Sequence, residues 1–336
     1  MGDQPLRRPS PDLLDTIYQC QQRQEWFRDY SLTNRLEVVP WVGSCTLEMD
    51  AVEVGATMRD VLNFAIDQRG PTWTDAFRKL GEHAENAGLL VMVSGVVGSN
   101  TRRQLQPSEF RGFALADPLA PIVFVNGADT RAAQIFTLAH EIAHIWLGQT
   151  GLDNVSLAVR AGDEVETWCN GVAAEFLVPL EDLREQYNAD AELGEELNRL
   201  ARRFKVSTLV IVRRLHEGQY LTRDQFRIAY RNELERVLDI ANDQPGGGNF
   251  YNMQPIRVSK MFARAVISDT LSGSTTYSDA FRMLGLRKSS TFNSLAVFIR
   301  AKNDHYSFDM VPAFWDWSTG PTEMDSSSQF SAYAMN

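Results

Sequence analysis

Two histidines and a glutamate interrupt an apolar run at residues 137 to 146, TLAHEIAHIW. His140 and His144 are four residues apart, so on a helix they share one face, about 40° from each other, and can hold one zinc ion together. Glu141 follows the first histidine, where its carboxylate can accept a proton from water activated by the metal. This HExxH pattern predicts a zinc-dependent hydrolase with Glu141 as the general base.

A catalytic zinc ion needs a third protein ligand, and the next predicted helix offers Asp163, Glu164, Glu166 and Glu175. Measured from Glu166, Glu164 lies about 160° and Glu175 about half a turn around the helix, while Asp163 is at the fraying start. We therefore expect Glu166 to be the third ligand. Asn170 lies four residues beyond Glu166 on the same face, so we expect it to hydrogen-bond a ligand histidine.

HExxH also arises by chance in buried helices, so its context matters. Here the motif lies in a helical pattern that ends at Gly148, and its neighbours Phe136, Leu138, Ile142, Ile145 and Trp146 are apolar. Two histidines and a glutamate buried among them without a metal would be costly. The context favours a metal site, whereas activity on protein substrates is a further inference.

The predicted elements mix helices with a few short strands. Helical spacing is found at 11–31, 48–68, 73–87, 131–148 and 163–178. Short runs rich in β-branched residues at 88–98 and 120–127 predict buried strands, and 109–117 could pair with either. We expect an α+β fold, in which a small sheet, the HExxH helix and the glutamate helix form a zincin-like core, followed by a helical C-terminal domain.

Changes in composition divide the chain into six segments. They are an N-terminal helical arm (1–47), the zincin-like domain (48–185), a helix-turn-helix-like helical domain (186–241), a Gly-rich linker (242–254), a C-terminal helical segment (255–297) and a tail (298–336). The linker is the clearest boundary, because NDQPGGGNF gives the backbone little reason to order.

The net charge of −10 argues against broad attraction to nucleic acid or anionic lipid. Cys20, Cys45 and Cys169 are scattered and have no CxxC spacing, so neither a disulfide framework nor a cysteine zinc cluster is indicated. The sequence shows no apolar run of membrane-spanning length and no signal peptide pattern, and we expect a cytoplasmic protein without membrane association.

Residues 197–222 are expected to form a helix, a tight turn and a second helix with Ser207 as its N-cap. Five basic residues there could contact DNA phosphates: Arg202, Arg203, Lys205, Arg213 and Arg214. The acidic balance of the chain favours the other interpretation, a solvated basic face on a helical packing domain.

The motifs FTLAHEIAHIWLG and ETWCNGVAAEFLVP resemble the ImmA/IrrE family of zinc metallopeptidase-like proteins, and the similarity extends over roughly residues 10–290. This resemblance implies that His140, His144 and Glu166 bind Zn²⁺ and that Glu141 is the catalytic base. Members of the family cleave or inactivate a partner repressor, which switches on mobile-element or stress genes, and others are encoded beside toxin genes. Many carry a DNA-binding domain ahead of the arm, whereas this sequence starts almost at the arm.

The end of the chain, from residue 298 to 317, resembles part of a PIN-like toxin, without a recognisable strand for the first catalytic aspartate of that fold. We interpret it as a toxin-like fragment or an aromatic-rich tail, with 318–336 disordered. The leading hypothesis is a metallopeptidase that cleaves a partner regulator. The alternative is a non-proteolytic antitoxin or regulator that neutralises a PIN-like toxin by binding.

Overall fold

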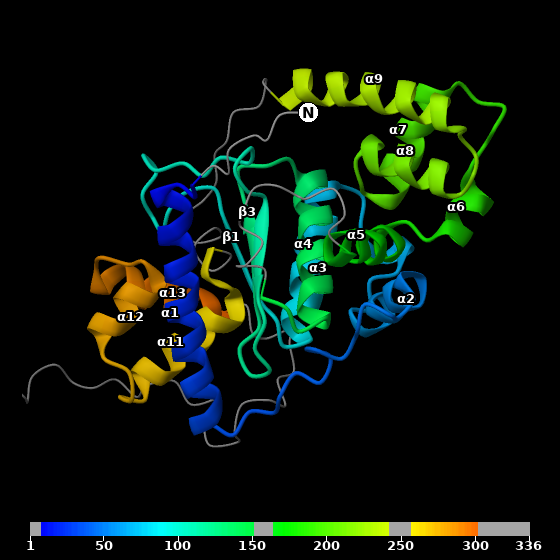
Figure 1. Ribbon diagram of the computed structural model, residues 1–336. Coiled ribbons are helices and arrows are strands. Elements are labelled where there is room, and N and C mark those ends of the chain that lie inside the picture. The colour runs from blue at the N-terminus through cyan, green and yellow to red at the C-terminus, as the bar shows by residue number, and fades with distance from the viewer. Residues whose placement is uncertain (1–7, 151–163, 242–256, 302–336) are drawn as a thin grey trace, which may run out of the picture.

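The computed structural model describes residues 8–150, 164–241 and 257–301 (Figure 1). Its elements in chain order are α1 (Pro11–Thr33), α2 (Ala51–Val61), the 3₁₀ helix η1 (Ile66–Gln68), α3 (Trp73–Asn86), β1 (Leu90–Ser94), β2 (Gly112–Leu115), β3 (Ile122–Asn126), α4 (Arg131–Trp146), α5 (Glu164–Leu177), α6 (Leu180–Gln186), α7 (Leu193–Phe204), α8 (Thr208–Glu217), α9 (Arg223–Ala241), α11 (Lys260–Leu271), α12 (Tyr277–Leu284) and α13 (Ser289–Ala301). The predicted α+β class is confirmed.

The sheet has the strand order β1-β3-β2. β1 and β3 are parallel, with Leu90 opposite Ile122, and β2 runs antiparallel to β3, with Gly112 opposite Val125. The predicted strand at 109–117, which was expected to pair with either neighbouring strand, therefore pairs with β3 and lies at one edge of the sheet. Every residue of β1 and of β3 is buried, as expected for strands covered on both faces.

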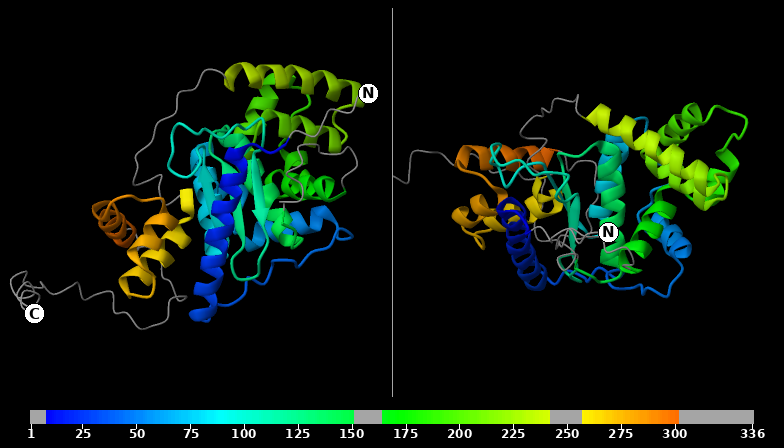
Figure 2. Two further views of the ribbon diagram at one scale, coloured as in Figure 1. Left: turned by 60° about the vertical axis from the view of Figure 1, so that its left-hand side comes forward. Right: turned by 45° about the horizontal axis from the view of Figure 1, so that its top comes forward.

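Helices cover both faces of this sheet (Figure 1, Figure 2). Side chains alternate along a strand, so Val91 and Val93 face the cluster that contains α3 and α4, while Leu90 and Met92 face the cluster that contains α1 and α11. The N-terminal arm and the C-terminal helices, far apart in sequence, thus share one face. The helix α4, which carries the HExxH motif, lies on the opposite face.

The C-terminal helices extend beyond the predicted helical segment at 255–297. α13 covers residues 289–301, because Phe292 and Leu295 form a buried apolar stripe at helical spacing. Residues 298–301 of the predicted toxin-like tail therefore belong to a helix, while the rest of the tail and the predicted linker lie outside the described residues. No helix in the described ranges is long and apolar enough to cross a membrane.

A carboxylate on α3 ties this C-terminal unit to the rest of the molecule. Glu85 accepts hydrogen bonds from the Ser259 hydroxyl at 2.5 Å and from the Lys260 backbone N–H at 2.8 Å. Both donors are at the N-terminus of α11, where a negative charge is favourable. Lys260 also pairs with Glu82, at 2.8 Å.

The C-terminus of α5 is held by three arginines from elsewhere in the chain. Arg59 donates to the Glu175 carbonyl at 2.7 Å, Arg69 to the Leu177 carbonyl at 2.6 Å, and Arg214 to the Val178 carbonyl at 2.8 Å. The last turn of a helix has unpaired carbonyls and a partial negative charge, so cations stabilise it. Pro179 follows and, as predicted, α5 ends before it.

The helix-turn-helix-like element packs on this end of α5. Ser207 caps α8 as expected, since its hydroxyl accepts from the Val210 backbone N–H. Arg214, expected on a basic solvated face, is instead buried and paired with Glu175 and Glu217. Arg203 pairs with Asp67 at 2.6 Å. At least two of the five basic residues therefore serve ion pairs within the chain.

Replacing Arg214 with Met should lower the free energy of unfolding by about 3–5 kcal/mol, because Glu175 would remain as a buried charge without its partner. Urea denaturation measures this change. The exposed Arg202→Met is the matched control and should change stability by about 0.5 kcal/mol or less. Equal urea midpoints for the two variants would contradict a stabilising role for the pair.

Candidate metal centre

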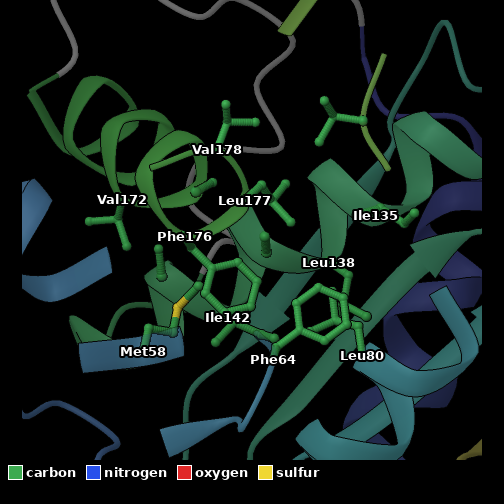
Figure 3. Packing of buried hydrophobic residues seen from close by; sticks show 14 of the residues in the cluster. Met58, Phe64, Leu80, Ile135, Leu138, Ile142, Val172, Phe176, Leu177 and Val178 are labelled. Atoms are coloured by element: carbon green, nitrogen blue, oxygen red, sulfur yellow. The ribbon is translucent and has the colours of Figure 1, made fainter. Parts of the chain in front are cut away.

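The helix α4 presents the two histidines of HExxH on one side. Thr130 begins the helix, its hydroxyl accepting from the Ala133 backbone N–H at 3.3 Å. The apolar residues of the motif face the sheet and α3, and Figure 3 shows Leu138 and Ile142 of α4 among Phe176 and Leu177 of α5. This packing leaves His140 and His144 facing the N-terminal part of α5.

Glu166 in the first turn of α5 completes a cluster with both histidines. The His140 Nε2 atom is 3.2 Å from one carboxylate oxygen of Glu166, and the His144 Nε2 atom is 3.4 Å from the other. The two Nε2 atoms are 3.1 Å apart. The predicted ligand set of His140, His144 and Glu166 is therefore brought together by the fold, with all ligand atoms within 4.8 Å of one another.

These separations fit a zinc ion. Bonds of about 2.0–2.1 Å in a tetrahedral site place neighbouring ligand atoms about 3.3 Å apart, close to the three distances found here. Nitrogen and carboxylate oxygen are also ligand types that zinc prefers. His140, His144 and Glu166 are thus suited to hold the metal as its protein ligands, with a fourth position open to water or substrate.

The three groups perturb one another electrostatically. Hydrogen bonding from His140 and His144 holds the pKa of Glu166 well below its usual range. Burial alone would lower the pKa of His144, but the neighbouring Cys169 thiol and the Glu166 carboxylate raise it to about 11. Without a metal, a proton on His144 offsets the negative charge of Glu166.

The general-base candidate Glu141 lies between this cluster and the edge strand β2. Its side chain is 8% exposed, and burial raises its pKa, partly offset by the two histidines. A Cβ atom at Gly112 would be 3.2 Å from the Glu141 Cγ atom and 2.6 Å from the Thr137 Cγ2 atom. Glycine at this position therefore lets the edge strand approach the carboxylate closely.

The position of α5 is fixed by its packing on α2. A Cβ atom at Gly55 would lie 2.8 Å from the Glu175 Cβ atom and 3.0 Å from the Val172 carbonyl oxygen, so the two helices are in close contact. The Trp168 indole N–H also donates to the Met49 carbonyl at 2.8 Å. These contacts hold the first turns of α5 where Glu166 meets the histidines.

The other acidic candidates do not reach the cluster. Glu164 is exposed, and Glu175 is buried against Arg214, so both point elsewhere, as helical geometry predicted. Asp163 lies outside the described residues. The Nδ1 atoms of His140 and His144 are buried and make no hydrogen bond within the described part of the chain. The hydrogen bond expected from Asn170 is thus not formed here, and its supporting role stays a prediction.

Two residues near the cluster were not assigned to it from the sequence. Cys169 is buried and lies against His144. It is three residues after Glu166, and this helical spacing could have indicated from the sequence that the two side chains are neighbours on α5. Gly112 was part of a predicted strand, and a glycine inside a strand often marks a close approach of the backbone.

Comparison with known proteins shows which family this chain is similar to. A family described as the IrrE N-terminal-like domain matches residues 84–216, and a domain of unknown function matches residues 258–297. The radiation response metalloprotease IrrE of Deinococcus radiodurans is 33% identical over 121 residues, which cover 34% of this chain and 36% of that relative. The alignment therefore spans about a third of the relative's length. These matches confirm the resemblance to the ImmA/IrrE family, with the family match at residues 84–216, and they do not test the resemblance of the end of the chain to a PIN-like toxin.

Changing Glu166 to Ala should remove most of the zinc from the purified protein, because one of the three protein ligands is lost. Metal analysis of the wild type should find about one zinc ion per chain. Glu164→Ala is the matched control, since it removes an exposed carboxylate two residues away in the same helical turn. Equal zinc contents in the two variants would exclude Glu166 as a ligand.

Zinc binding to the metal-free protein should release a proton, because His144 is protonated below its raised pKa and must be neutral to bind the metal. The apparent zinc affinity should therefore rise with pH, by about tenfold per pH unit for each proton displaced. Titration calorimetry in two buffers of different ionisation enthalpy measures the number of protons. A heat of binding that is the same in both buffers would contradict the protonated state of His144.

Proposed function

We propose that this chain, a member of the ImmA/IrrE family through its IrrE N-terminal-like domain, is a zinc-dependent metallopeptidase that hydrolyses a peptide bond in a partner regulatory protein. The observation that carries the proposal is the convergence of His140, His144 and Glu166 beside the buried Glu141. Such a set combines a metal site with a separate carboxylate that is free for proton transfer.

The chemistry divides between the metal and Glu141. Zinc supplies Lewis acidity, which lowers the pKa of water and polarises a carbonyl group. Glu141 accepts the proton of the attacking water and returns it to the leaving amine. Burial raises the pKa of Glu141 toward the range in which a carboxyl group can do both. Its place beside the ligands, rather than among them, leaves it available for this role.

The edge strand β2 offers a place for an extended substrate. The Arg111 carbonyl accepts from the Asn126 N–H at 2.7 Å, so by antiparallel alternation the backbone groups of Gly112 and Ala114 point to the open side of the sheet. A peptide paired there would add a strand to the sheet. Because Gly112 contacts Glu141, the paired peptide would pass close to the catalytic carboxylate.

The change Glu141→Gln should leave the zinc content unchanged and lower the rate of peptide cleavage by about 10²–10⁴-fold, since the amide cannot accept the proton. To find the substrate, wild type and Glu141→Gln are each incubated with an extract of the source organism. New protein N-termini are then identified by mass spectrometry, and those produced by the wild type alone mark cleavage sites.

The competing function is a non-proteolytic regulator or antitoxin that acts by contact. It predicts that Glu141→Gln keeps the full effect on the partner and that no new N-termini separate the two samples. That outcome, with zinc present in both proteins, would overturn the peptidase proposal and leave the metal with a structural role.

A further inference from the structure

The accessible side of α4 leads from the candidate metal ligands back to the start of the helix. Between residues 132 and 146, the side chains of α4 that are not buried are Ala132, Ala133, Phe136 and His140. These positions are three or four residues apart, so they form one stripe along the helix. The Phe136 and His140 ring centroids are 6.4 Å apart, with an interplanar angle of 24°. A substrate that reaches His140 can therefore extend along this stripe.

The edge strand β2 borders the same stretch of α4. Gly112 lies against Thr137 and Glu141, since a Cβ atom at this glycine would contact both side chains. One residue earlier, the Nε atom of Arg111 is 3.5 Å from a carboxylate oxygen of Asp129, which is two residues before α4 begins. The strand therefore runs beside the helix, and the Arg111 side chain lies at the N-terminal end of the accessible stripe.

The Arg111 guanidinium is accessible to another molecule. Its side chain is 66% exposed, and the contact with Asp129 is an ion pair without a hydrogen bond. An exposed ion pair of this kind contributes little to stability, so the fold does not require Arg111. The terminal nitrogens of Arg111 donate no hydrogen bond within the described part of the chain. They can therefore receive a carboxylate from a bound peptide, in the forked geometry that arginine favours.

The other charged groups at this end of α4 are less available. Arg131 begins the helix, but its guanidinium lies over the Phe77 ring, 5.4 Å from the centroid, and donates to the Gln134 side chain. The Asp129 side chain is only 13% exposed, so it is largely shielded from a substrate. Among the described residues at this end, Arg111 is therefore the cation that a peptide lying along the stripe would meet.

We propose that Arg111 is a specificity-determining residue, which binds an acidic side chain of the substrate on one side of the scissile bond. This inference rests on the proposed peptidase function, because it describes the substrates of that site. Asp129 precedes His140 by 11 positions, which corresponds to about 16 Å at the rise of a helix. An extended peptide covers this distance with about five residues. The acidic residue is therefore expected within about five residues of the scissile bond.

The test is titration calorimetry of the zinc-loaded full-length protein with alanine-based peptides that carry a zinc-binding hydroxamate at one end or the other, which requires no turnover. Glu and Gln are compared at each position up to about the fifth from the hydroxamate. At one position, Glu should bind about three- to fivefold more tightly than Gln, the order expected for one exposed ion pair. Arg111→Gln should remove this preference. Arg102→Gln, which removes an exposed arginine from the loop after β1, should retain it.

Two results would overturn the role of Arg111 and leave the proposed zinc site intact. One is equal binding of the Glu and Gln peptides at every position, and the other is a preference for Glu that Arg111→Gln retains. Failure of every hydroxamate to bind is a different result, which would overturn the proposed function together with this inference. Because Arg111 is exposed, Arg111→Gln should keep its zinc content and its urea midpoint, and these measurements separate a lost preference from misfolding.

Discussion

The candidate metal centre depends on the crossing of α4 and α5, because its three expected ligands come from both helices. His140 and His144 would be two neighbouring imidazoles without Glu166, and Glu166 would be a carboxylate at the start of a helix without them. Their mutual distances of 3.1–3.4 Å exist because apolar side chains of both helices pack in one core. The close contact of Gly55 with α5 fixes the same helix from its other side.

Positive charge at the other end of α5 complements this arrangement. Arg59, Arg69 and Arg214 bind carbonyls at the C-terminus of the helix, while Glu166 lies in its first turn. Both features follow the helix dipole, which favours anions at the N-terminus and cations at the C-terminus. Arg214 of the helix-turn-helix-like domain therefore contributes to the candidate metal centre indirectly, by helping to fix the helix that carries Glu166.

The sheet separates two regions of different chemistry. The α4 face carries the candidate metal ligands and Glu141, whereas the other face carries the arm and the C-terminal unit. The unit that matches a domain of unknown function is tied to α3 through Glu85 and packs on the same strands as α1.

The local pattern of the sequence determined the elements and most of the site. The histidine spacing, the apolar stripe of α4 and the position of Glu166 in the next helix are short-range features, so they predicted the ligand set and the α+β class. Tertiary structure decided what depends on contacts between distant residues. It buried Arg214 against Glu175, extended the last helix to Ala301, and placed Gly112 against Glu141. It also packed α1 and α11 on one face of the sheet, and helices more than two hundred positions apart in the chain meet only when both ends of the chain fold onto that face.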